Sequence, residues 1–425
     1  MRNFTRRDFL KLCGTSSIGL ALAACGVTPT PTATPAPTNT PLPTSTPLPT
    51  ATTILTNTPA PTSTATATAT ATPRPPTLRS VGEQLRVYLG TTVDGAEGYQ
   101  DPRYISAARE HFSVLFNSAI QQSTIDRWGL EMVRVFRRRA TADNQIFNIH
   151  PAFWHQDVSA LLKNASDDEV KRYMENRIRT ILGFVERVDT GAKPTYINFY
   201  NEALLYGQGK PGWHASPYYR VFGDRVITEA YLLFYRIAQT LNLQVGKDFR
   251  LLYSDYDIFR PGGKTDAVFD TLVRSKRDIA NALDTSQDKI QLDIAIQYHL
   301  DISNPPKFNG YFPVPTDDEM LTNFRRFAQI GRIHITEFDV ADAQSQAEIT
   351  AILRRVTRTA ITSGLVDSIN YWNSLRVYET DYDKTKRESG GEIFYHPIGL
   401  FDRNYTPTDA YRALLQDLIE LSAKK

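Results

Sequence analysis

Residues 78–425 alternate between two patterns of hydrophobic and polar positions. Short runs rich in β-branched and aromatic residues, bounded by Gly, Pro, Asn or Asp, are typical of strands. One of them, Ile333–Asp339, alternates apolar and polar side chains and brings the carboxylate of Glu337 to its C-terminal end. Eight such runs occur, at 86–91, 112–117, 145–150, 195–201, 249–255, 291–299, 333–339 and 368–372.

Longer segments with apolar residues every three or four positions lie between these runs and predict helices. Ser166 to Glu169 and Thr316 to Glu319 each have the spacing of a capping box, which satisfies the free amides of a helix start. The predicted helices cover 167–188, 217–242, 265–283, 317–328, 346–363 and 407–421. Strands that alternate with helices pair in parallel. Eight such units predict an α/β fold, a (β/α)8 TIM barrel with its active site at the C-terminal strand ends.

The first 24 residues differ in composition from this domain and predict an export signal. Thr5–Lys11 contains paired arginines followed by Asp-Phe-Leu-Lys, which resembles a twin-arginine signal. Leu22-Ala23-Ala24-Cys25 resembles a bacterial lipobox, in which the cysteine carries lipid after cleavage. Alternatively, Cys25 is only a small residue at the end of a signal peptide. We favour lipidation, which predicts a signal peptide at 1–24 and an exported, extracellular or cell-surface lipoprotein.

Residues 25–77 predict a disordered tether between this lipid site and the domain at 78–425. Residues 28–77 are almost only Thr, Pro, Ala and Ser and hold 13 of the 25 prolines of the chain. Such a segment has too little apolar surface to offset the entropy of ordering. The only other cysteine, Cys13, lies in the predicted signal, so the mature chain has no disulfide. No later apolar run reaches the ~20 residues of a spanning helix, so the lipid is the only expected membrane contact.

Charge argues against a nucleic-acid partner. Residues 1–24 hold four basic residues and one acidic residue, so the formal charge of +2 becomes −1 once they are removed. A nucleic-acid-binding domain is usually basic. The run Arg137-Arg138-Arg139 is interpreted as the solvated face of a helix. A near-neutral, monomeric protein that acts on a neutral polysaccharide fits this balance.

Two glutamates fall at C-terminal strand ends, Glu202 after the run 195–201 and Glu337 within 333–339. Taken singly, each has a structural interpretation, as a helix-start residue and as an ion-pair partner. Together they suggest glycosidase chemistry, which needs one carboxyl to protonate the leaving oxygen and a second to attack or assist at the anomeric carbon.

The residues around both glutamates resemble glycoside hydrolase family 10, the β-1,4-xylanase family. Tyr-Asn-Glu-Ala-Leu at 200–204 resembles its Val-Asn-Glu-Ala segment, which carries the acid/base. His-Ile-Thr-Glu-Phe-Asp at 334–339 resembles its Ile-Thr-Glu-Leu-Asp segment, which carries the nucleophile. Further similar segments follow the order of the family, at 150–156, 253–257, 297–299, 371–372 and 399–402.

The resemblance implies roles for these residues, with Glu202 as acid/base and Glu337 as nucleophile. It implies six substrate-binding residues at the same end of the barrel: His150, Trp154, Asn201, Gln297, His299 and Trp372. Asn201 would bond a sugar 2-hydroxyl, or else cap a following helix; His299 would orient Glu337, or else be a core histidine bonded to backbone. Gln297 would bond a hydroxyl or the nucleophile, and His150 a glycone hydroxyl. Trp154 and Trp372 would stack on sugar rings or else lie in the core.

The sequence also departs from the family pattern. The family's Glu-Asn-x-x-Lys run, which builds the glycone pocket, is replaced by Phe116-Asn117 and 118–122, without the acid and the lysine. Its Trp-Asp pair becomes Ile197-Asn198, the Gly after the last tryptophan becomes Asn373, and Tyr378 stands where a second tryptophan is expected. These departures affect substrate identity more than hydrolysis.

The sequence therefore predicts a retaining glycosidase that cleaves β-1,4-xylosidic bonds in xylan without a cofactor or a metal. Its two carboxyls are expected to lie about 5 to 5.5 Å apart. Three alternatives stay open: a barrel hydrolase for another β-glycan, a tethered carbohydrate-binding protein without turnover, and a transport-type binding lipoprotein. The last would have two lobes in place of one barrel.

Overall fold

The predicted barrel is present in the computed structural model. The structure describes residues 74–93, 101–117, 130–157, 162–185, 193–207, 210–302, 312–341, 346–372, 374–375, 399–402 and 404–424. The predicted signal peptide, Cys25 and the tether as far as residue 73 lie outside these ranges. Among the described residues, no helix combines the length and apolar character needed to cross a bilayer.

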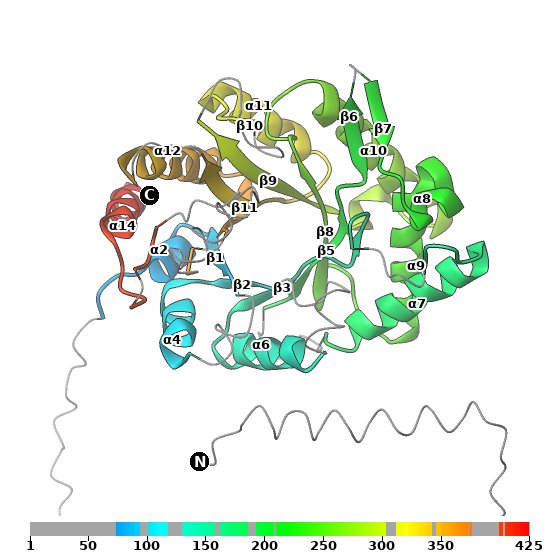
Figure 1. The fold of residues 1–425 in the computed structure, drawn as a ribbon, viewed down its shortest axis with the longest axis horizontal. Coiled ribbons are helices and arrows are strands. Elements are labelled where there is room, and N and C mark those ends of the chain that lie inside the picture. Colours follow the sequence, from blue (N-terminus) through cyan, green and yellow to red (C-terminus); the bar gives the residue numbers. More distant parts are fainter. Residues whose placement is uncertain are drawn as a thin grey trace, which may run out of the picture. The chain divides into compact units, whose positions relative to one another are not determined.

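Eight parallel strands close into a barrel inside a ring of helices (Figure 1). Each strand pairs in parallel with the next, and β1 pairs with both β2 and β12, which closes the sheet. These strands are β1 (Tyr88–Thr92), β2 (Val114–Asn117), β3 (Ile146–Ile149), β5 (Thr195–Asn201), β8 (Phe249–Tyr256), β9 (Asp293–Asp301), β11 (Ile333–Ala341) and β12 (Val366–Tyr371). All eight predicted strands are confirmed, because runs buried on both faces are nearly continuous in apolar residues.

Four short strands were not predicted: β4 (Phe153–Trp154), β6 (Leu204–Gly207), β7 (Lys210–Trp213) and β10 (Phe312–Pro313). β6 and β7 form an antiparallel hairpin that starts two residues after Glu202. The interpretation of Glu202 as a helix start is therefore wrong, and so is that of Asn201 as a helix cap.

The six predicted helices begin within two residues of the expected positions, whereas α2 and α4 were not predicted and α6 was implied only by the arginine run at 137–139. They are α2 (Leu78–Gln84), α4 (Pro102–His111), α6 (Glu131–Ala142), α7 (Asp167–Leu182), α8 (Pro217–Phe222), α9 (Val226–Thr240), α10 (Gly263–Ala282), α11 (Asp317–Phe327), α12 (Gln346–Ser363) and α14 (Asp409–Ser422). Both predicted capping boxes are formed, with Ser166 and Thr316 accepting hydrogen bonds from the amides of Glu169 and Glu319.

Two helix predictions need correction. The helix expected at 217–242 is broken by Gly223, whose φ of 55° is left-handed, so α8 ends there and α9 begins three residues later. The arginine run at 137–139 is not uniformly solvated: the Arg137 side chain lies on the buried face of α6 and is only 8% exposed, whereas Arg138 is exposed. The amphipathic period of α6 decides this, because position 137 follows Met132, Val133 and Phe136 onto the apolar face.

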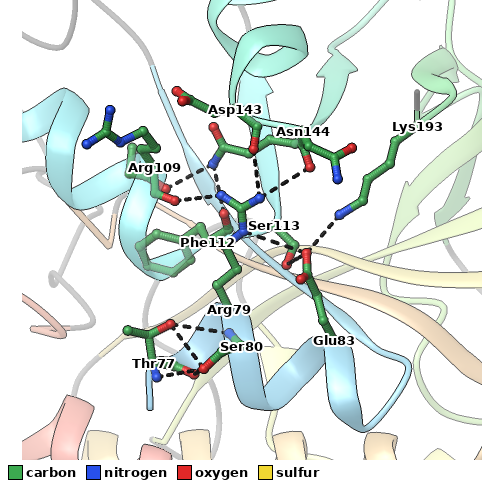
Figure 2. Close-up of polar contacts among 12 residues, drawn as sticks. Thr77, Arg79, Ser80, Glu83, Arg109, Phe112, Ser113, Asp143, Asn144 and Lys193 are labelled. Atoms are coloured by element: carbon green, nitrogen blue, oxygen red, sulfur yellow. Dashed lines mark hydrogen bonds and ion pairs between the residues drawn. The ribbon is translucent and has the colours of Figure 1, made fainter. Parts of the chain in front are cut away.

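Hydrogen bonds and an ion pair hold helix α2 at the N-terminal end of the barrel strands (Figure 2). The Arg79 guanidinium donates hydrogen bonds to the carbonyls of Arg109, at 2.8 Å, and Asp143, at 2.7 Å. These carbonyls belong to the ends of α4 and α6, where a cation is favoured by the helix dipole. Glu83 accepts a bond from Lys193 at 2.7 Å. The described chain therefore begins opposite the C-terminal strand ends.

A buried ion network fills the barrel interior near the same N-terminal strand ends. Arg250 Nη2 donates to Asp293 Oδ1 at 2.8 Å, and His334 Nε2 lies 3.5 Å from Asp293 Oδ2. Burial alone would raise the pKa of Asp293, but His334 and Arg250 outweigh it and lower the pKa to about 2. The carboxylate therefore stays charged, and it pairs with Arg250 and His334 inside the barrel.

Candidate active site

Both predicted catalytic glutamates lie at the C-terminal strand ends in unusual backbone conformations. Glu202 has a φ of 52° and Glu337 a φ of 54°, in the left-handed region that non-glycine residues rarely adopt. The ladder between β11 and β9 shifts register between Thr336 and Asp339, and that between β5 and β8 shifts just before Tyr200. Such irregularities re-aim side chains. Each left-handed residue costs on the order of 1 kcal/mol, which the surrounding barrel must offset.

Glu202 is held by three donors and is only 8% exposed. Trp154 Nε1 donates to Glu202 Oε2 at 2.8 Å, while Asn201 Nδ2 and Gln297 Nε2 donate to Oε1 at 3.0 and 3.1 Å. The amide of Glu202 donates to the Ser254 carbonyl at 2.8 Å. Strand β5 therefore presents this carboxyl at a defined point above β8 and β9.

The environment of Glu202 favours its protonated form. Burial, together with the charges of Glu337 and Asp255, raises the pKa of Glu202 to about 7 against the lowering effect of the bonds from Trp154 and Gln297. Desolvation penalises the charged carboxylate, and a second carboxylate nearby repels it. Near neutral pH this group exchanges a proton readily.

Glu337 lies between two imidazoles and is 6% exposed. His299 Nε2 lies 3.2 Å from Glu337 Oε2, and His150 Nε2 lies 3.6 Å from Oε1. Burial alone would raise the pKa of Glu337, but the imidazoles of His150 and His299 outweigh it, so the pKa lies below its usual range. Glu337 is therefore ionised where Glu202 is protonated.

The two histidines differ in their second partner. His299 Nδ1 is 2.7 Å from Asp339 Oδ1, and His150 Nδ1 is 2.7 Å from Asn198 Nδ2. Burial alone would lower the pKa of His299, but the carboxylates of Asp339 and Glu337 raise it well above its usual value. Burial lowers the pKa of His150. The interpretation of His299 as a histidine bonded only to backbone is wrong, since both ring nitrogens face carboxylates.

The structure brings the other predicted site residues to the same end of the barrel, with some contacts that differ from expectation. Gln297 donates to Glu202 and to Asn201 Oδ1, at 3.0 Å, and not to Glu337. The indole N–H of Trp154 donates a hydrogen bond to Glu202. The Trp372 ring packs edge-on against Phe116 and His150, with centroids 5.4 and 6.0 Å apart. Stacking of either tryptophan on a sugar stays a prediction.

Several residues around the site were not singled out from the sequence. Asp339 lies two positions after Glu337, and Asn198 lies four before Glu202; both face histidines that are remote in the chain. Near Glu202, the rings of His155 and His214 stack 3.7 Å apart at an interplanar angle of 11°. Burial and the neighbouring His214 lower the pKa of His155 to about 4. The period-2 alternation of the strands would have marked Asp339 as facing the same way as Glu337.

Behind Glu202, Lys264 Nζ lies 2.6 Å from Asp255 Oδ1 and 3.0 Å from the ring centroid of Tyr256. Both members of this ion pair are almost fully buried.

In the described part of the chain, no group of three or more His, Cys, Asp or Glu could hold a metal ion. Some positions where the sequence departs from the family pattern lie outside the described residues. They are 118–122, Asn373 and Tyr378.

Comparisons with known proteins agree with the barrel fold. The sequence model described as "Glycosyl hydrolase family 10" matches residues 78–417. Xylanase 10B from Thermotoga petrophila RKU-1, solved with xylobiose, superimposes with a TM-score of 0.63 at 21% identity, covering 83% of this chain and 99% of that chain. Native xylanase 10B from Thermotoga maritima gives a TM-score of 0.63 at 20% identity, covering 82% and 100%. The enzyme XylE, an endo-1,4-beta-xylanase from Penicillium canescens, gives 0.63 at 17% identity, covering 81% and 98%. No curated protein matches the chain.

Proposed function

Because the chain belongs to glycosyl hydrolase family 10, we propose that it hydrolyses β-1,4-xylosidic bonds in xylan with retention of anomeric configuration. The proposal rests on one observation: the pKa values of two neighbouring carboxyl groups are shifted in opposite directions. Burial raises the pKa of Glu202 to about 7, while that of Glu337 is lowered despite its burial. The carboxyl with the raised pKa is assigned as the acid, and the carboxyl with the lowered pKa as the nucleophile.

In the first step, protonated Glu202 gives its proton to the glycosidic oxygen while the Glu337 carboxylate attacks the anomeric carbon. The bond to the leaving sugar breaks, and a glycosyl ester forms on Glu337. His299, held by Asp339, faces Glu337 Oε2. It orients that oxygen and stabilises the negative charge before attack.

In the second step, Glu202 is a carboxylate and takes a proton from a water that attacks the same carbon. The ester breaks, Glu337 is released, and the product keeps the configuration of the substrate. Trp154, Asn201 and Gln297 all donate toward Glu202. These donors stabilise its ionised form, so a pKa near 7 allows it to serve as acid and then as base.

Product analysis tests the proposal directly. Wild-type protein on xylan is expected to release xylo-oligosaccharides, and ¹H NMR during the first minutes should show the β-anomer before mutarotation. Immediate α-anomer would overturn retention. Turnover of another β-glycan with none on xylan would favour a related barrel hydrolase, since Phe116 replaces the acid expected in the glycone pocket. Binding to xylan without any product would favour the non-catalytic alternative.

The hydrogen bond from Trp154 to Glu202 leads to a prediction about how activity depends on pH. Activity requires protonated Glu202, so kcat/KM should fall as pH rises through about 7. Trp154→Phe removes a donor that lowers the pKa of Glu202. The alkaline limb should therefore move to higher pH, by on the order of one unit. Trp213→Phe is the matched control, because Trp213 stacks on Tyr219 and not on the acid/base. A limb that moves equally in both variants, or downward in Trp154→Phe, would contradict the assignment.

We also propose export and lipidation at Cys25, supported by the paired arginines at 6 and 7 and by the Thr/Pro-rich segment that follows. Labelling with a radioactive fatty acid should mark the wild-type protein. Cys25→Ala should lose the label and leave the membrane fraction.

A further inference from the structure

Asn198 makes a contact that the proposed mechanism does not yet use. It lies on β5 and is fully buried. Its side-chain Nδ2 lies 2.7 Å from His150 Nδ1, and its backbone carbonyl accepts a bond from the Ala152 amide at 2.9 Å. The His150 amide in turn donates to the Asn117 carbonyl at 2.9 Å. Both partners are therefore fixed by their own strands, and the side-chain contact is built into the barrel.

The other ring nitrogen of His150 faces the candidate nucleophile. Nε2 lies 3.6 Å from Glu337 Oε1, an oxygen that has no hydrogen-bond partner among the described residues. A carboxylate oxygen accepts hydrogen bonds and repels a lone pair. A neutral ring protonated only at Nδ1 would place its Nε2 lone pair against this carboxylate and its N–H against the amide donor. An imidazolium would satisfy Oε1 through Nε2–H, but its Nδ1–H would face the same amide donor. The remaining comparison is between this cation and a neutral ring with the proton on Nε2.

The surroundings of His150 decide between these two states. The ring is 3% exposed and packs against Phe116, with centroids 4.8 Å apart, and against Trp372. The charged groups that act on it are Glu337, which favours the cation, and His299, which opposes it. Burial among apolar rings penalises the cation and lowers the pKa of His150. The amide of Asn198 cannot ionise, so it offers no charge to balance a second cation.

We propose that Asn198 holds His150 as a neutral imidazole with its proton on Nε2, so that His150 is an uncharged donor facing Glu337 Oε1. Asn198 is then a positioning residue for the nucleophile. The same carboxylate is flanked by two histidines with different charge: His299 is paired with a carboxylate, Asp339, and His150 with an amide. The His299 cation orients Oε2, and the neutral His150 ring orients Oε1 as an N–H donor, which also favours the ionised form of Glu337.

The importance of this arrangement for attack rests on the proposed function, but the state of His150 does not. ¹⁵N-histidine NMR of the full chain, which has seven histidines, identifies the protonated nitrogen without any substrate. Signals are assigned with His150→Gln. We expect His150 in the wild type to show Nε2–H and to stay neutral from pH 5.5 to 8. A ring protonated at Nδ1, or one that is cationic in this range, overturns the proposal whether or not the protein hydrolyses xylan.

Asn198→Asp is the decisive variant. Its carboxylate, which restores the acid of the family's Trp-Asp pair, should accept a hydrogen bond from a protonated Nδ1. The ring should therefore take up a proton from solvent and become an imidazolium from pH 5.5 to 8. Asn370→Asp is the matched control, because Asn370 is equally buried on β12 and its amide atoms have no partner among the described residues. It should leave His150 neutral. A neutral ring in Asn198→Asp, or the same change in both variants, overturns the proposal. A neutral ring in a wild type that does not hydrolyse xylan refutes the function and not the inference.

Discussion

Glu337→Gln is expected to lower kcat on xylan by on the order of 10⁴-fold or more, the scale seen when a nucleophile is removed. The amide has nearly the shape of the carboxylate but no negative charge, so it does not form the glycosyl ester. KM should change little, because the substrate-binding groups stay in place. Initial rates on xylan, with the fold checked by thermal unfolding, measure the effect.

Two further variants make this prediction specific. Glu337→Gly with sodium azide should recover turnover by direct attack in place of the carboxylate, and the product should be the α-glycosyl azide, of inverted configuration. Glu83→Gln is the matched control, since Glu83 is a paired carboxylate at the opposite end of the barrel. It should reduce stability and not kcat. Near wild-type activity in Glu337→Gln would refute the assignment of the nucleophile.

Glu202→Ala is expected to lower kcat on xylan by about 10²- to 10⁴-fold, the usual contribution of general acid–base catalysis. The loss should depend on the leaving group. With a dinitrophenyl xylobioside, departure needs no proton, so the first step should stay fast and a burst of dinitrophenolate should appear. The second step then lacks its base and limits turnover.

Azide separates the roles of the two glutamates. In Glu202→Ala it should attack the glycosyl ester on Glu337 without a base and give the β-glycosyl azide, the opposite anomer to that from Glu337→Gly. The fall in kcat/KM near pH 7 should also disappear, because its titrating group is gone. An equal loss of activity for all leaving groups, or an unchanged alkaline limb, would show that another residue is the acid.

The barrel was predictable because its determinants are local. Each of the eight strands is a run of apolar residues that needs no distant information to identify, and the two capping boxes mark helix starts within four residues. The failures have local causes as well. Gly223 broke a predicted helix through a single left-handed φ, and α6 turned Arg137 inward although the next residue of the run, Arg138, is exposed.

The sequence predicted which residues belong to the site but not which of them are in contact. The sequence alone located Glu202 and Glu337 at strand ends and listed two of the histidines, His150 and His299, and two tryptophans that accompany them. It did not show that Gln297 donates to Glu202, or that Asp339 and Asn198 select the charges of two histidines. These are distances between strands far apart in the chain, and no periodicity encodes them.

By itself, then, the sequence determined the eight-strand alternation and the residue types at the strand ends, because hydrophobic period and capping act over a few residues. The resemblance to the family assigned Glu202 as the acid, but only the tertiary structure shows which neighbours favour its protonated form. The pKa of a carboxyl depends on burial and on charges within a few ångströms, and those neighbours are set by how β5, β9 and β11 close around one another. Glu337 was recognisable as an acid at a strand tip, but its ionised state is a property of the closed barrel.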